Sequence, residues 1–125
     1  AISKQKIAIE LFHDESDLLY MMMGKYIMQD RNLTEEAIKY IKSSLRINNR
    51  NTYSWFLLAD LYSENDLPRA HYATAERYFL LRDYPMSYKF TVKSLKEIEK
   101  NTPEWYRAHD LLNIMKRPEK ENNNQ

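Results

Sequence analysis

Cysteine is absent from this chain of 125 residues, which excludes disulfide bonds and thiolate metal sites. One glycine and four prolines are too few for a turn-rich β domain, and a single glycine excludes a glycine-rich phosphate loop. Neither sign of charge dominates, because 19 basic residues face 18 acidic ones, so no overall field favours nucleic acid. The longest apolar run, residues 18–23, is far shorter than the roughly 20 residues that span a bilayer. We therefore expect no nucleic-acid partner and no direct membrane insertion.

Large side chains are abundant instead: ten tyrosines, six methionines and two tryptophans supply apolar surface for a folded core. Apolar residues recur at spacings of three and four, which predicts helices joined by short connections and no strand. We predict about seven helices, over residues 2–12, 17–28, 35–47, 53–62, 68–81, 86–98 and 103–116. Residues 1–116 would form one helical domain, followed by a disordered polar tail over 117–125. Because the chain begins with Ala1 inside the first helix, we expect a fragment of a longer protein.

Local signals refine these helices. The only glycine, Gly24, lies in the middle of a predicted helix, where it costs about 1 kcal/mol relative to alanine, so we expect a neighbouring helix to approach it closely. Thr34 is a plausible N-cap, and Thr102-Pro103-Glu104 combines a capping hydroxyl, a first-turn proline and an acid at the positive helix end. The predicted buried stripe of the helix over 17–28 consists of Leu19, Met23, Tyr26 and Ile27.

An internal repeat of 35 residues relates two parts of the chain. A large residue, a small residue four positions later and a large residue three positions after that occur twice, as Tyr20, Gly24 and Ile27 and as Trp55, Ala59 and Tyr62. A period in this range is typical of helical-hairpin solenoids, in which each hairpin buries its apolar face against a neighbour. The segment 68–81 fits either position in a hairpin, as a second helix after DLPRA or as a first helix before RDYP.

These residues resemble the tetratricopeptide (TPR) repeat, and NLTEEAIKYIKSSL is similar to its second helix. Asn49, where the repeat usually has a helix-ending proline, departs from the pattern, as does Ser87 in place of the usual alanine. The resemblance implies an all-α, right-handed α-solenoid of antiparallel helical hairpins that binds protein or peptide partners.

A narrower resemblance covers residues 67–112. RAHYATAERYFLLRDY and NTPEWYRAHDLL are similar to the C-terminal TPR domain of bacterial periplasmic, BepA-like zinc metalloproteases. The catalytic H-E-x-x-H of that family is absent from this chain. The resemblance implies a non-catalytic, substrate-recruiting or regulatory part of a metalloprotease, located in the periplasm. The alternatives are a free-standing TPR adaptor or scaffold, which would be cytoplasmic, and a self-associating helical repeat module.

No catalytic, metal-binding or cofactor-binding pattern is legible. The three histidines, His13, His71 and His109, have no second ligand at a helical spacing that would place it on the same face. Partly buried or surface histidines account for them better, so we predict no metal, no cofactor and no enzymatic activity for this segment.

The methionine cluster of the helix over 17–28 is the strongest candidate site. Consecutive residues on a helix point in different directions, so not all of these methionines can face one core, and flexible thioethers suit a peptide-binding surface. The alternative is contact with a neighbouring helix. The first helices of TPR hairpins line a concave groove, which implies the following groove residues: Met21, Met22, Lys25, Met28, Gln29, Phe56, Asp60 and Ser63. Such a mixed apolar and charged surface could hold an extended peptide or a partner helix.

Overall fold

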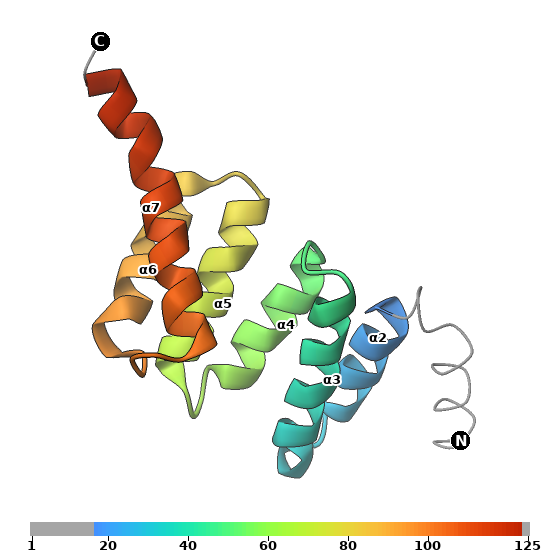
Figure 1. The fold of residues 1–125 in the computed structure, drawn as a ribbon. Coiled ribbons are helices and arrows are strands. Elements are labelled where there is room, and N and C mark those ends of the chain that lie inside the picture. Colours follow the sequence, from blue (N-terminus) through green and yellow to red (C-terminus); the bar gives the residue numbers. More distant parts are fainter. Residues whose placement is uncertain (1–16, 124–125) are drawn as a thin grey trace. The chain divides into compact units, whose positions relative to one another are not determined.

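The computed structural model describes residues 17–123, with side chains as far as Lys116, and each regular element in that range is helical (Figure 1). The elements in chain order are α2 (Asp17–Ile27), the 3-10 turn η2 (Arg31–Leu33), α3 (Thr34–Ile47), α4 (Thr52–Tyr62), α5 (Leu67–Leu80), α6 (Tyr84–Glu97) and α7 (Pro103–Asn123). The prediction of an all-α chain is therefore confirmed. The predicted helix over residues 2–12 lies outside the described residues.

The chain divides into two compact units between Leu61 and Tyr62. The first unit contains α2, α3 and nearly all of α4, and the second contains α5, α6 and α7. The division of the chain into one domain over 1–116 and a disordered tail over 117–125 stays a prediction, although α7 itself continues to Asn123. The stacking of the helices into a solenoid also stays a prediction.

In the first unit, α2 and α3 form a helical hairpin that packs closely at Gly24 (Figure 1). A Cβ atom placed on Gly24 would lie 2.5 Å from Cδ1 of Ile41 and 3.3 Å from the carbonyl oxygen of Ala37. Both Ile41 and Ala37 are fully buried. The glycine is therefore required where α3 approaches α2, which confirms the packing role predicted for it.

The turn between α2 and α3 corrects one predicted cap. Thr34 is the first residue of α3 and donates its hydroxyl hydrogen bond to the carbonyl of Arg31, at 2.9 Å. Leu33 occupies the N-cap position without a side-chain bond, whereas Asp30 caps the preceding 3-10 turn by accepting from the amide of Asn32. The cap was wrong because η2 inserts an extra turn before α3, so Thr34 is the first residue of the helix and Leu33 takes the N-cap position.

Helix α4 is anchored to the preceding helix and loop by polar contacts. The hydroxyls of Ser44 on α3 and Ser54 on α4 are both fully buried and lie 2.9 Å apart, so each satisfies the other. The indole nitrogen of Trp55 donates to the carbonyl of Asn49 at 2.8 Å. The backbone carbonyl of Asn49 thus supplies the partner that the buried indole needs.

In the second unit, α5 and α6 form an antiparallel hairpin. The hydroxyl of Ser87 donates to the carbonyl of Ala75, and that of Ser94 donates to the carbonyl of Pro68, both at 2.8 Å. Since the later residue of α6 contacts the earlier residue of α5, the two helices run in opposite directions. The segment 67–80 is thus the first helix of a hairpin before RDYP, which decides between the two positions that its sequence allows.

Each helix of the second unit begins at a side-chain cap. Asp66 accepts from the amide of Arg69 at the start of α5, and Asp83 accepts from the amide of Met86 at the start of α6. The amide of Trp105 donates to the hydroxyl of Thr102 at 3.2 Å. The predicted start of α7 at Thr102-Pro103-Glu104 is confirmed.

Candidate functional site

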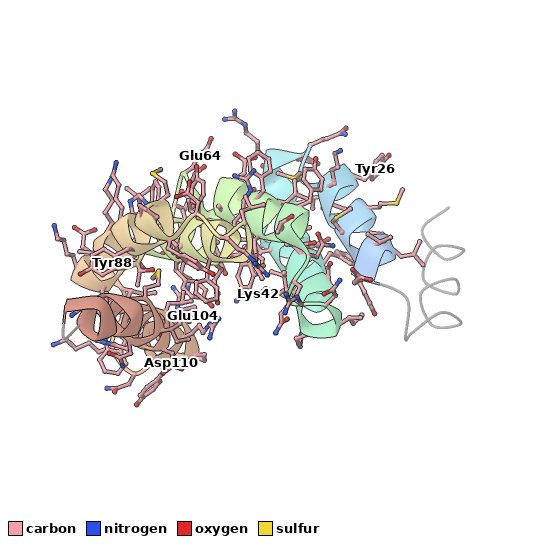
Figure 2. All side chains as sticks on the ribbon, turned by 90° about the horizontal axis from the view of Figure 1, so that it is seen from above. Tyr26, Lys42, Glu64, Tyr88, Glu104 and Asp110 are labelled. Carbon is pink, nitrogen blue, oxygen red and sulfur yellow. The ribbon has the colours of Figure 1, made fainter. Side chains whose placement is uncertain are left out.

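A row of large apolar side chains lies exposed along α2. Leu18, Met22 and Tyr26 follow one another at intervals of four residues and are 57%, 60% and 74% exposed. Residues four apart form a continuous ridge on a helix surface. Tyr26 was predicted to be buried, and that prediction is wrong: its side chain projects into solvent (Figure 2). It follows Gly24 by two residues, or about 200° around the helix, so it faces away from α3.

The start of α4 adds two aromatic rings to this exposed side of α2. The rings of Tyr53 and Phe56 stack with centroids 5.9 Å apart, and both side chains are partly exposed. The Lys25 Nζ lies 5.0 Å from the centroid of the Tyr53 ring, a cation–π contact that joins the two helices. We call this the α2–α4 surface, and it consists of Leu18, Met22, Lys25, Tyr26, Gln29, Tyr53, Phe56 and Asp60.

Polar contacts at one end of α2 fix it against the start of α4. The side-chain nitrogens (Nδ2) of Asn48 and Asn51 donate to Oδ2 of Asp17, at 3.2 Å and 3.4 Å. The same Asn51 nitrogen lies 3.5 Å from the sulfur of Met21, and the Asn51 side-chain oxygen accepts from the amide of Ser54. The two helices of the surface are therefore held in register by side chains that do not belong to it.

The predicted groove residues divide into three groups. Met22, Lys25 and Gln29 on α2, together with Phe56 and Asp60 on α4, are exposed and belong to the α2–α4 surface. Met21 and Met28 are only half-buried at its edge, because they lie on the side of α2 that turns toward neighbouring residues. Ser63 is exposed just after α4 and belongs to the second unit.

Three members of the surface, Leu18, Tyr26 and Tyr53, were not among the predicted groove residues. Spacing carried the missing signal, since Leu18, Met22 and Tyr26 are four apart and Tyr53 precedes Phe56 by three. Aliphatic and aromatic residues at helical spacing are ordinarily core residues, so the sequence favoured burial for them.

The second unit contains a buried charged network between α5 and α7. The Glu76 carboxylate, whose side chain is 7% exposed, accepts from the Tyr72 hydroxyl at 2.6 Å and from Nε of Arg107 at 3.0 Å. The hydrogen bond to Glu76 raises the pKa of Arg107, and burial followed by the nearby Glu76 charge raises the pKa of Tyr72. All polar groups of Glu76 are thus satisfied, which is typical of a structural ion pair.

A second pair lies beside this network. Nη1 of Arg69 lies 2.7 Å from Oδ2 of Asp66. Nε of Arg69 lies 3.9 Å from Oε2 of Glu104, which is labelled in Figure 2. That oxygen is buried and has no hydrogen-bond partner among the described side chains. Arg69 and Arg107 thus each tie α7 to α5, the first weakly and the second through two hydrogen bonds.

The described histidines pack against aromatic rings. His71 lies 5.6 Å from the Phe90 ring and His109 lies 4.4 Å from the Trp105 ring, measured between centroids. Burial, followed by the nearby Lys93 charge, lowers the pKa of His71. Across the described residues, no three His, Asp or Glu side chains gather as a metal site would require, and His13 lies outside them.

In the described part of the chain, no helix has the length and apolar character needed to cross a bilayer, which agrees with the prediction of no direct membrane insertion. Comparison of the chain with protein-family models, with curated proteins and with solved structures found no match in any of the three.

Proposed function

We propose that this chain is a non-catalytic protein-binding domain and that it binds its partner through the α2–α4 surface. The observation that carries the proposal is the exposure of five large apolar side chains around one lysine: Leu18, Met22, Tyr26, Tyr53 and Phe56. An apolar patch with a polar rim is typical of a protein-interaction site. Removing aromatic rings, a thioether and an aliphatic side chain from water lowers the free energy, which favours binding. These groups do not transfer protons or other chemical groups, so the surface is suited to binding rather than to catalysis.

The rigidity of the surface supports the proposal. Lys25 is held over Tyr53, and Asn51 links α2 to the start of α4. A surface that is already ordered loses little side-chain freedom on binding, which favours affinity. Exposed aromatic side chains are also the residues that most often dominate binding energy at interfaces.

The biological setting that we propose is substrate recruitment or regulation in a periplasmic zinc metalloprotease. This part rests on the resemblance of residues 67–112 to the C-terminal TPR region of such enzymes. A free-standing TPR adaptor is the alternative. The complete gene distinguishes them: an H-E-x-x-H motif upstream supports the metalloprotease, and a full-length reading frame without it supports the adaptor.

Affinity capture with a matched pair of double variants tests the binding surface. Lys25→Glu with Phe56→Ala alters the α2–α4 surface, and Lys39→Glu with Tyr88→Ala makes the same changes at exposed positions elsewhere. We expect the first variant to lose the partner and the second to retain it, with unchanged helicity by circular dichroism for both. Equal capture by both variants would reject this surface.

A further inference from the structure

We infer that the partner segment held by the α2–α4 surface is an amphipathic α-helix of another protein that carries a carboxylate beside its apolar stripe. This inference rests on the proposed function and makes it more specific. Three features of the surface support the inference: the rows of side chains on α2, the absence of unpaired backbone groups on the two helices, and the lack of an ion-pair partner for Lys25 among the described residues.

The ridges of α2 suit a helix laid across them. Leu18, Met22 and Tyr26 form one exposed row of residues four apart, and Met21, Lys25 and Gln29 form the next row beside it. Rows of this kind interdigitate with the side-chain rows of a second helix. The first row extends from Leu18 to Tyr26, eight steps of 1.5 Å or about 12 Å, which corresponds to roughly two turns of the partner.

The absence of a row of unpaired backbone groups on these two helices argues against an extended peptide. Each residue of an extended peptide presents an amide and a carbonyl that need partners once they are covered. The surface consists of helix side chains, and the backbone groups of α2 and α4 are already paired within each helix, so only the tips of its polar side chains could serve as partners: Lys25, Tyr26, Gln29, Tyr53 and Asp60. A helix satisfies its own backbone groups and can cover such a surface without leaving them unpaired.

Lys25 specifies the charge of the partner. Its ammonium lies over the Tyr53 ring, and it forms no ion pair with a carboxylate of the described residues. Covering an ammonium with an apolar surface removes its water and is costly unless an anion replaces that water. A carboxylate on the partner, next to its apolar stripe, provides this replacement.

Peptide selection on the whole chain tests the inference without a known ligand. The probe is a phage-displayed library of random peptides of about 15 residues, enough for four helical turns. Enriched peptides are then synthesised in three forms: unchanged, with each Glu or Asp replaced by its amide, and with a central proline, which breaks a helix but not an extended chain. Affinity is measured against the unchanged chain, Lys25→Glu, Phe56→Ala and the matched control Lys39→Glu.

We expect the enriched peptides to gain helicity on binding and to lose at least tenfold in affinity on insertion of proline. Lys25→Glu should weaken them by about tenfold through lost attraction and added repulsion, whereas Lys39→Glu should have no such effect. Replacing the acidic residue by its amide should weaken binding to the unchanged chain and relieve the effect of Lys25→Glu.

The contrary results separate the two levels of the proposal. If the peptides bind at this surface but tolerate proline, the partner is not a helix. If they bind there but show no preference for an acidic residue, the partner needs no carboxylate. In both cases the proposed function stands. Enriched peptides that ignore both Lys25→Glu and Phe56→Ala, or no enrichment at all, overturn both. Two other occupants of the surface are tested separately. If the chain is a dimer and Met22→Asp dissociates it, the occupant is a second copy of the chain. If deletion of residues 1–16 greatly raises the affinity for the peptides, the occupant is that segment.

Discussion

A Cβ atom added at Gly24 provides the most direct test of how the first unit is packed. The new carbon would lie 2.5 Å from Cδ1 and 2.8 Å from Cγ1 of Ile41, about 1 Å inside the usual contact distance between carbon atoms. Ile41 is fully buried, and its branched side chain is stiff at χ1, so Cγ1 cannot simply rotate away from the new atom. Relief therefore requires a shift of α3, whose Ala37 carbonyl is already 3.3 Å from the new atom.

Two opposing free energies decide the effect of Gly24→Ala. Helix propensity favours alanine by about 1 kcal/mol, and overpacking a close-packed site costs about 1–3 kcal/mol. We expect a net destabilisation of about 1 kcal/mol, and of several kcal/mol for Gly24→Leu. The penalty should decrease when Ile41→Val removes Cδ1, and Gly24→Ala should become stabilising when Ile41→Ala removes both clashing atoms.

Urea unfolding monitored by Trp55 fluorescence measures these differences in the unit that contains Gly24. Trp105→Phe makes Trp55 the sole tryptophan, and Trp55 is nearly buried with its indole bonded to Asn49, so its emission reports unfolding of the first unit. The unchanged chain, Gly24→Ala, Ile41→Ala and the variant with both changes form a double-mutant cycle. The expected coupling free energy is about 2 kcal/mol. Stabilisation by Gly24→Ala in the unchanged background would refute the close approach of α3.

Three further predictions concern single groups. Ser44→Ala and Ser54→Ala should each cost about 1–3 kcal/mol in urea unfolding, because each leaves a buried hydroxyl unpaired, and the double variant should cost less than their sum. Arg82 has a φ of 62° at the end of α5, where glycine is unstrained, so Arg82→Gly should raise stability by about 0.5–1 kcal/mol; a lower melting temperature would contradict this. Burial and Glu76 raise the pKa of Tyr72 in the folded state, so the unfolded chain loses this proton first as pH rises past about 10. The folded state binds more protons there, stability falls with rising pH, and Tyr72→Phe should flatten that fall in melts recorded across this range.

Helix positions were largely predictable because the signals that set them are local. The start of α7 follows from Thr102, whose hydroxyl accepts from the amide of Trp105. Thr34 shows the limit of such signals, since its hydroxyl bonds to the carbonyl of Arg31 and Asp30 caps a 3-10 turn that the periodicity does not reveal. Competing local hydrogen bonds of similar strength cannot be ranked from residue types alone.

The pairing of helices was not predictable to the same degree. Small and apolar residues lie on more than one side of α5, so its sequence permits a partner before it or after it. The structure assigns α6 through the hydroxyls of Ser87 and Ser94, which bond to carbonyls of α5. Whether a serine bonds to its own helix or to a neighbour depends on packing between helices, and residue spacing does not contain that information.

For the candidate site, the sequence located the helices of the surface better than its side chains. Met22, Lys25 and Phe56 are exposed, whereas Met21 and Met28 are half-buried, because each step along the helix rotates the side chain by about 100°. Which side of α2 faces solvent depends on the position of α3, which packs against α2 at Gly24. Whether the surface binds a partner stays a prediction.

The ion pair between Glu76 and Arg107 constrains how this protein can be shortened. A fragment that ends before residue 103 would retain Glu76 and lose the guanidinium that neutralises it, leaving an unmatched charge in the remaining hairpin. Recombinant versions intended for crystallisation or spectroscopy should therefore keep α7 together with α5 and α6.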